Sequence, residues 1–114
     1  MRLLKSDNSH YQGQADPFIF KSNGRYYIYV TGHDAIYAYH SDDLFSDWQY
    51  FGPVLRVPGL HAFWAPSVIE LDGKFYMYNS MEGSGVEADQ GGHDGCMHVS
   101  VADNPLGPFR MVKR

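Results

Sequence analysis

Cysteine is nearly absent from this 114-residue chain, which contains Cys96 alone. A single thiol cannot form an intramolecular disulfide, so the fold has to be held together by packing and hydrogen bonds. One free cysteine is tolerated in reducing compartments too, and the sequence gives no indication of redox chemistry. We therefore expect one small domain built around one apolar core, as is usual at this length.

Long apolar runs are missing as well. No segment approaches the roughly 20 apolar residues that a membrane-spanning helix needs. The N-terminal segment, MRLLKSDNSHYQG, turns polar after two leucines and lacks the apolar stretch of a signal peptide. These absences predict a cytoplasmic protein with no membrane partner, and secretion of a longer precursor stays open as the alternative.

Basic residues are few and scattered. Nine Lys and Arg stand against thirteen Asp and Glu, which gives a formal net charge of −4. A protein that binds the phosphate backbone gathers its basic residues on one face. The sequence therefore predicts no nucleic acid partner.

Aromatic residues, in contrast, are abundant at 16% of the chain, nine of them Tyr. This composition suits strands with one solvated face and surfaces that stack on sugar rings. Two aromatic and β-branched segments, 25–31 and 74–79, each follow a turn signal, Asn23-Gly24 and Asp72-Gly73. The pattern predicts two β-hairpins. Glycine and proline interrupt every window that a helix would need, so the predicted fold class is all-β.

The two hairpins belong to an internal repeat. Gly24 aligns with Gly73, and three further pairs share the same offset of 49 residues, namely Pro17 with Pro66, Tyr27 with Tyr76, and Tyr29 with Tyr78. A third strand follows in each unit at an offset of 61 residues, in segments 36–40 and 97–101. The second unit therefore carries 12 additional residues between its second and third strands. A fourth strand completes each unit.

Two units of four antiparallel strands, each about 50 residues long, are typical of β-propeller blades. The sequence predicts one partial propeller domain over residues 1–114, with blade one at about 14–55 and blade two at about 63–114. Repeat folds need about three or more units to enclose a core, so two blades leave apolar faces bare. We expect remaining propeller blades, the favoured interpretation, or self-association to cover them.

One rim of the propeller is the predicted site. The first strand of each blade lines the central axis, so its start lies beside the end of the second strand. These positions hold Asp16 and His33 in the first unit and Trp64 and Glu82 in the second. The repeat keeps its proline but has Ala65 where the first unit has Asp16. Because the fold does not require a carboxylate there, we expect Asp16 to be functional.

Each of these residues has a structural alternative. Asp-Pro starts turns in many proteins, and Trp64 is large enough to serve as packing between blades. Loop polarity alone accounts for His33 and Glu82. The tyrosines at 26, 27 and 29 are expected to be core and blade face. A group that resembles a metal cluster matches no standard zinc spacing, so we expect neither metal nor cofactor; its members are His93, Asp94, Cys96 and His98.

Five segments, in this order and spacing, make the chain similar to a known family. They are ADPFI (15–19), GRYYIYVTG (24–32), HSDDLFSDW (40–48), FWAPSVIELDGKFYMY (63–78) and VADNPLGPF (101–109). The chain resembles glycoside hydrolase family 43, five-bladed propeller enzymes that cleave arabinofuranosides, xylosides and related plant cell-wall glycosides. The resemblance implies that Asp16 is the general base and that Trp64 lies near the sugar. An oligosaccharide or polysaccharide is the implied substrate.

The resemblance also implies an inverting mechanism that needs more than Asp16. Family members use three carboxylates, and the general acid and the pKa-modulating aspartate belong to later blades. We expect these beyond Arg114, so that the chain is an N-terminal fragment without its general acid and is inactive in isolation. Hydrolysis with inversion requires an acid and a base about 6.5 to 9.5 Å apart.

Two other functions stay open at this point. A lectin-like propeller would bind plant glycans without cutting them, although it would be expected to repeat its ligands, whereas Asp16 and Ala65 differ. An invertase-like propeller would use the aspartate as a nucleophile, but such enzymes usually continue Asp-Pro-Asn-Gly where this chain has Phe18-Ile19. The sequence does not choose between arabinose, xylose and galactose.

Overall fold

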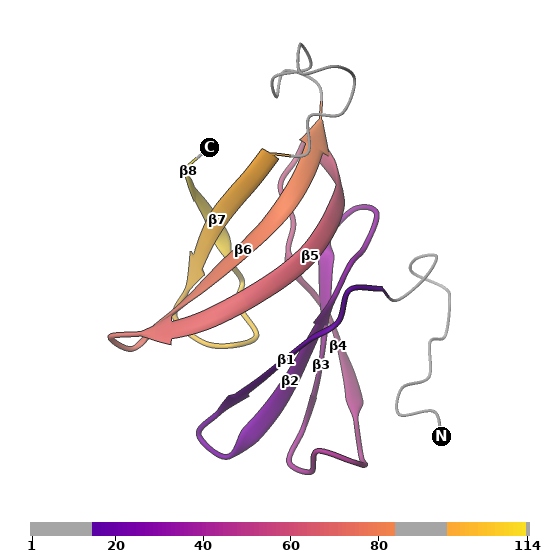
Figure 1. The fold of residues 1–114 in the computed structure, drawn as a ribbon, viewed down its shortest axis with the longest axis vertical. Coiled ribbons are helices and arrows are strands. Elements are labelled where there is room, and N and C mark those ends of the chain that lie inside the picture. Colours follow the sequence, from indigo (N-terminus) through magenta and orange to yellow (C-terminus); the bar gives the residue numbers. More distant parts are fainter. Residues whose placement is uncertain (1–14, 84–95, 114) are drawn as a thin grey trace.

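The computed structural model describes residues 15–83 and 96–113, which form eight strands in two four-stranded antiparallel sheets (Figure 1). The first sheet has the order β1-β2-β3-β4 and the second the order β5-β6-β7-β8. The strands are β1 (Phe18–Ser22), β2 (Arg25–Val30), β3 (Ile36–Ser41), β4 (Gln49–Leu55), β5 (Leu60–Leu71), β6 (Lys74–Gly83), β7 (Cys96–Ala102) and β8 (Arg110–Lys113). The predicted all-β fold of two four-stranded blades is confirmed.

No helix that could cross a membrane occurs in residues 15–83 and 96–113.

The two predicted hairpins form as the turn dipeptides require. Asn23 and Gly24 have φ values of 51° and 77°, and Asp72 and Gly73 have values of 52° and 77°. Positive φ at both central residues is the property of the two-residue turns that match the twist of paired strands. These turns fix the register of β1 on β2 and of β5 on β6.

The sequence repeat is also a repeat of contacts. In the first sheet, Arg25 Nε lies 2.8 Å from Asp42 Oδ1. In the second sheet, Lys74 Nζ lies 2.7 Å from Asp103 Oδ1. The basic residues are 49 positions apart and the acidic residues 61 positions apart, which are the two offsets read from the sequence. Each ion pair joins the start of a second strand to the turn after the third.

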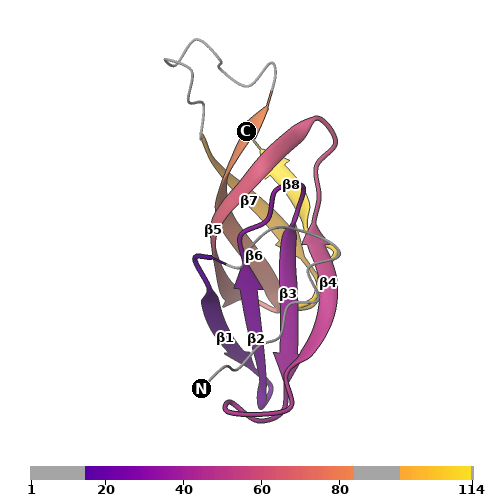
Figure 2. The same ribbon diagram turned by 90° about the vertical axis from the view of Figure 1, so that its right-hand side faces the viewer.

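The main core lies between the two sheets, which face each other in Figure 2. Tyr29 is fully buried there, and its hydroxyl donates a 2.7 Å hydrogen bond to the Pro105 carbonyl oxygen of the other sheet. The first sheet contributes Tyr27, Tyr29, Ile36, Ala38, Val54 and Leu55 to this core, and the second contributes Phe63, Val68, Phe75, Met77, Met81, Ala102 and Phe109. The expectation that Tyr27 and Tyr29 are core residues is confirmed, whereas Tyr26 is half-buried.

A smaller cluster lies on the opposite face of the first sheet. Residues alternate across a strand, so the neighbours of Tyr27 and Tyr29 point the other way. The cluster consists of Ile28, Val30, Ala35, Tyr37 and Tyr39, with Trp48 packed against it. The first sheet is therefore apolar on both faces, as a blade between two neighbours should be.

The outer face of the second sheet is apolar but exposed. Ile69, Tyr78 and Met97 have 50%, 41% and 66% of their surface exposed. By the repeat offsets of 49 and 61 residues, these three residues correspond to Phe20, Tyr29 and Ile36 of the first sheet. The first sheet uses those residues to pack against the second sheet. The outer face of the second sheet is therefore apolar at the positions where the first sheet is packed against a neighbouring blade.

Candidate active site

Backbone hydrogen bonds join the two sheets along one rim. The Gly32 amide donates to the Phe63 carbonyl oxygen at 3.0 Å, and the Phe63 amide donates to the Gly32 carbonyl oxygen at 2.8 Å. The Ala62 amide donates to the His33 carbonyl oxygen at 2.6 Å. The end of β2 is therefore fixed to the start of β5, and these three bonds are called the rim seam below.

Asp16 lies exposed at this rim, at the head of the first sheet. The Thr31 hydroxyl donates a 3.1 Å hydrogen bond to Asp16 Oδ2, and the Thr31 amide donates to the Ala15 carbonyl oxygen at 3.0 Å. Within the described part of the chain, Oδ1 of Asp16 has no hydrogen-bond partner. The carboxylate is thus held on one side and open on the other.

Trp64 and Ala65 stand at the corresponding place in the second sheet. Trp64 is 37% exposed, so it is not confined to packing between the blades. Ala65 has a φ of 49°, and Asp16 has a φ of 50°. A residue before proline normally adopts an extended conformation with negative φ. Both heads therefore have an unusual positive φ before proline, and only the first carries a carboxylate.

His33 and Glu82 flank a third residue, His61, that the sequence did not single out. The ring centroids of His33 and His61 are 5.8 Å apart, with an interplanar angle of 40°. His61 stands opposite Glu82 in the pairing of β5 with β6. The rim therefore brings together residues from the connection between β2 and β3, from β5 and from β6. No local signal in the sequence marked His61, because its contact with His33 forms only where the two sheets meet.

Glu82 lies near the end of β6, which continues to Gly83, and its side chain is half-buried. His93 and Asp94 lie outside the described residues. His98 is buried in β7, opposite Asn79. Among the residues described, no group of three or more His, Cys, Asp or Glu is placed to hold a metal ion.

A second carboxylate near the rim, Asp34, is tied to its neighbours. The Tyr37 hydroxyl donates to Asp34 Oδ1 at 2.5 Å, and Arg56 Nη2 lies 3.3 Å from Asp34 Oδ2. Burial disfavours the ionised form of Asp34, but the Tyr37 hydrogen bond and the Arg56 charge outweigh it, so its pKa is lowered. Burial, with the hydrogen bond to Asp34, raises the pKa of Tyr37 to about 12. Asp34 is therefore an ionised structural partner, unsuited to act as a general acid.

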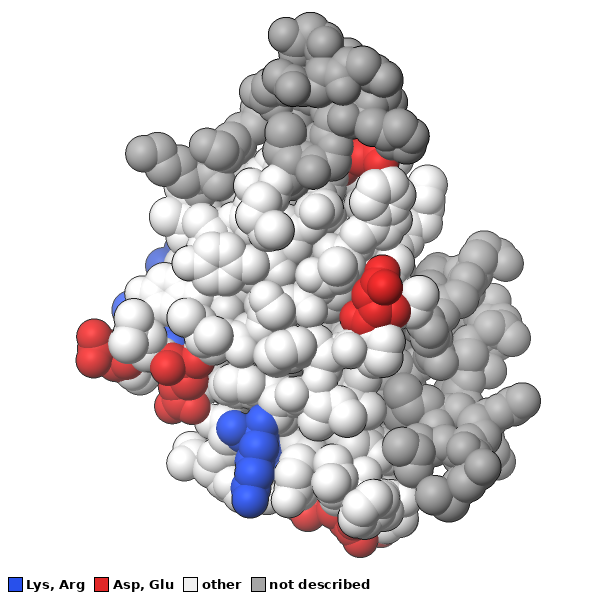
Figure 3. Space-filling model, in the orientation of Figure 1, with Lys and Arg blue, Asp and Glu red and all other residues white. Residues whose placement is uncertain are grey.

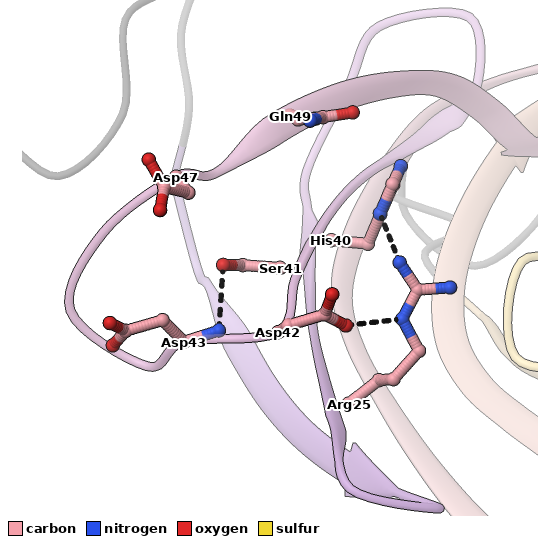
Figure 4. A pocket seen from close by; sticks show the side chains of 7 residues that line it. All are labelled: Arg25, His40, Ser41, Asp42, Asp43, Asp47 and Gln49. Carbon is pink, nitrogen blue, oxygen red and sulfur yellow. Dashed lines mark hydrogen bonds and ion pairs between the residues drawn. The ribbon is translucent and has the colours of Figure 1, made fainter.

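The opposite end of the first sheet contains a polar pocket (Figure 4). Arg25 lies at one side of it, where its Nε donates to Asp42 Oδ1 and its Nη2 lies 3.4 Å from His40 Nδ1. Its lining consists of Arg25, His40, Ser41, Asp42, Asp43, Asp47 and Gln49. The second sheet repeats the central ion pair as Lys74 with Asp103. Because the same ion pair occurs in both sheets, we interpret it as a structural contact of each blade. The pocket lies at the start of β2, at the opposite end of this strand from Asp16.

Two adjoining four-stranded sheets that share a hydrogen-bonded rim define this chain as blades of a β-propeller. The chain belongs to the family described as glycosyl hydrolases family 43, whose profile matches residues 9–113. The resemblance read from the sequence motifs is thereby confirmed.

The chain is also similar to individual curated proteins and to solved structures. The chain is 30% identical over 99 residues to a probable arabinan endo-1,5-alpha-L-arabinosidase B of Aspergillus oryzae, covering 82% of this chain and 26% of that protein. A solved endo-arabinase from Bacteroides thetaiotaomicron is 28% identical, with a TM-score of 0.74, over 93% of this chain and 36% of the other. A thermostable family-43 glycoside hydrolase is 32% identical, with a TM-score of 0.74, over 89% of this chain and 32% of the other. The chain spans about a quarter of the length of the curated relatives it matches.

Proposed function

We propose that this chain carries the general base of an inverting glycoside hydrolase that acts on arabinofuranosides or xylosides of the plant cell wall. The observation that supports it best is the comparison of Asp16 with Ala65. The two have nearly the same positive φ before a proline at the same rim, but the carboxylate is present once. The fold does not need a carboxylate at this position, so we assign Asp16 the catalytic role of general base.

In this mechanism ionised Asp16 takes a proton from water as the water attacks the anomeric carbon. Attack comes from the face opposite the leaving group, so the configuration inverts. The leaving oxygen needs a proton from a carboxylic acid about 6.5 to 9.5 Å from the base. We propose that this acid and a third carboxylate are carried by further blades of the intact protein.

The rim supplies groups suited to a neutral sugar. Trp64 is partly exposed, and aromatic faces stack on pyranose and furanose rings. His33, His61 and Glu82 lie on the same rim and offer hydrogen-bonding groups. Few charged side chains lie on the described part of the face shown in Figure 3. The named arabinanase relatives make α-1,5-linked arabinan the first substrate to test.

The exposed outer face of the second sheet supports the proposal that further blades exist. Its apolar residues match those that the first sheet buries against the second. We propose that a third sheet of the same kind covers this face in the intact protein. The two rim heads would then look into an axial pocket closed by later blades.

The decisive experiment replaces Asp16 in the full-length protein that carries this chain. Asp16→Asn keeps the shape and removes the base, so turnover of linear arabinan or of an aryl arabinofuranoside falls by at least about a hundredfold. Added azide should yield a glycosyl azide of inverted configuration. Ala65→Asp is the matched control, and combining it with Asp16→Asn restores nothing because it faces the axis from another blade.

Two results would reject this function. Undiminished hydrolysis by Asp16→Asn would mean that the base lies elsewhere. Arabinan binding by the full-length protein without any hydrolysis would favour the lectin-like alternative.

A further inference from the structure

One hydroxyl group connects the heads of the two blades. Thr31 Oγ1 donates to Asp16 Oδ2 at 3.1 Å and accepts from the Ala65 amide at 3.1 Å. A hydroxyl has one hydrogen to donate and two lone pairs to accept with. Because the Ala65 amide occupies a lone pair, the hydroxyl hydrogen is directed toward the Asp16 carboxylate. The Thr31 backbone is itself fixed by its bond to Ala15.

We propose that Thr31 is the positioning residue of the general base. It holds the Asp16 carboxylate by Oδ2, so that Oδ1 faces the water, and it ties this orientation to the strand that carries Trp64. The inference rests on the function proposed above. A base helps only when it is fixed in the productive geometry before the reaction begins, so the hydrogen bond contributes to turnover more than to sugar binding.

A merely structural role for the hydroxyl is weakened by two observations. The sheets are already joined at this rim by the three backbone bonds of the rim seam. A second hydroxyl, Ser22 Oγ, donates to Glu70 Oε1 across the sheets at 2.8 Å, at the far end of β1. The same chemical contact thus exists away from Asp16 and provides a matched control. The repeat has Ser80 where the first blade has Thr31, so the equivalent position of the second blade holds a serine.

Kinetics of four variants of the full-length protein test the inference. Thr31→Val keeps the shape, and its kcat on arabinan falls at least about tenfold with KM changed less than about twofold. Thr31→Ser keeps the hydroxyl and stays within about threefold of the parent kcat. Ser22→Ala loses a comparable hydrogen bond between the sheets and stays within about twofold in kcat. Melting temperatures of Thr31→Val and Ser22→Ala fall by similar amounts.

The fourth variant, Asp16→Asn, separates failure of this inference from failure of the proposed function. If Asp16→Asn is inactive while Thr31→Val has the parent kcat, the positioning role is wrong and the base assignment stands. The role is also wrong if Thr31→Ser is as slow as Thr31→Val, or if Ser22→Ala is as slow as either. If Asp16→Asn retains turnover, both proposals fall.

Discussion

Gly32 shows how a single residue permits the two blades to meet. A Cβ atom at this position would lie 2.2 Å from the Ala35 carbonyl oxygen and 2.7 Å from carbons of the Tyr37 ring. Both neighbours are buried, and Gly32 also makes two of the three bonds of the rim seam. Only glycine lets the end of β2 lie this close to its own blade while pairing with the next.

Gly32→Ala should therefore reduce the free energy of unfolding by about 3 kcal/mol, because backbone atoms would have to move. Gly24→Ala is the control, since Gly24 has a φ of +77° with nothing within 4 Å of the added atom. It should cost only about 1 kcal/mol, from the left-handed backbone alone. Denaturant unfolding measures both, and equal losses would show that the close approach at Gly32 is unimportant.

His40 makes stability depend on pH. Burial and then the Arg25 charge lower its pKa, and these outweigh the opposite effect of Asp42. The unfolded chain takes up a proton near pH 6.5, where the folded ring stays neutral, so stability falls as the pH drops through about 6.5. In His40→Gln, the free energy of unfolding should decline less between about pH 7 and about pH 5 than in the parent. Parallel pH profiles from denaturant unfolding would contradict this.

At the scale of the element, β5 marks the limit of what the sequence could predict. The hairpin turns were predictable because Asn-Gly and Asp-Gly determine the backbone locally. β5 has register shifts between His61 and Trp64 and between Trp64 and Ser67, with positive φ at Ala62 and Ala65. Alanine gives no local signal for such a conformation, which is stabilised by pairing with the neighbouring blade.

Some residues of the candidate site could be identified from the sequence, and others could not. Asp16 could be found from the sequence because the repeat supplied Ala65 for comparison. Thr31 and His61 could not, since their contacts cross between blades. The Thr31 hydroxyl reaches the Ala65 amide, and the His61 ring lies near His33, only when β2 and β5 are joined at the rim.

The connection from β6 to β7 provides a prediction about substrate preference. Met81 pairs with Cys96, so these strand ends are adjacent and a short turn can bridge them. In the full-length protein, replacing residues 84–95 with a short turn should change the melting temperature by less than about 5 °C, since loop length costs little. The ratio of kcat/KM values on arabinan and on an aryl arabinofuranoside should change, because the connection starts beside Glu82 at the rim. A large loss of melting temperature with an unchanged ratio would mean that the connection is structural.

At the scale of the whole molecule, the exposed apolar face of the second sheet should govern behaviour in solution. Exposed patches of this kind bind a partner or aggregate. The isolated 114-residue chain should therefore associate at micromolar concentration, as measured by light scattering. Ile69→Lys with Met97→Glu should reduce association, because both residues lie on that face.

Phe45→Ser is the control, since Phe45 is 69% exposed but lies in the turn between β3 and β4. It should leave association unchanged. A parent chain that stays monomeric and melts sharply would show that two blades suffice as a stable unit.

The matching backbone of Asp16 and Ala65 bears on how such a site arises in evolution. The positive φ before the proline is present in both blades, with and without a carboxylate, so this backbone does not depend on the catalytic side chain. Two of the four alanine codons differ from an aspartate codon by one nucleotide. A duplicated blade can therefore gain or lose a carboxylate at its head by a point mutation, while the surrounding main chain stays as it was.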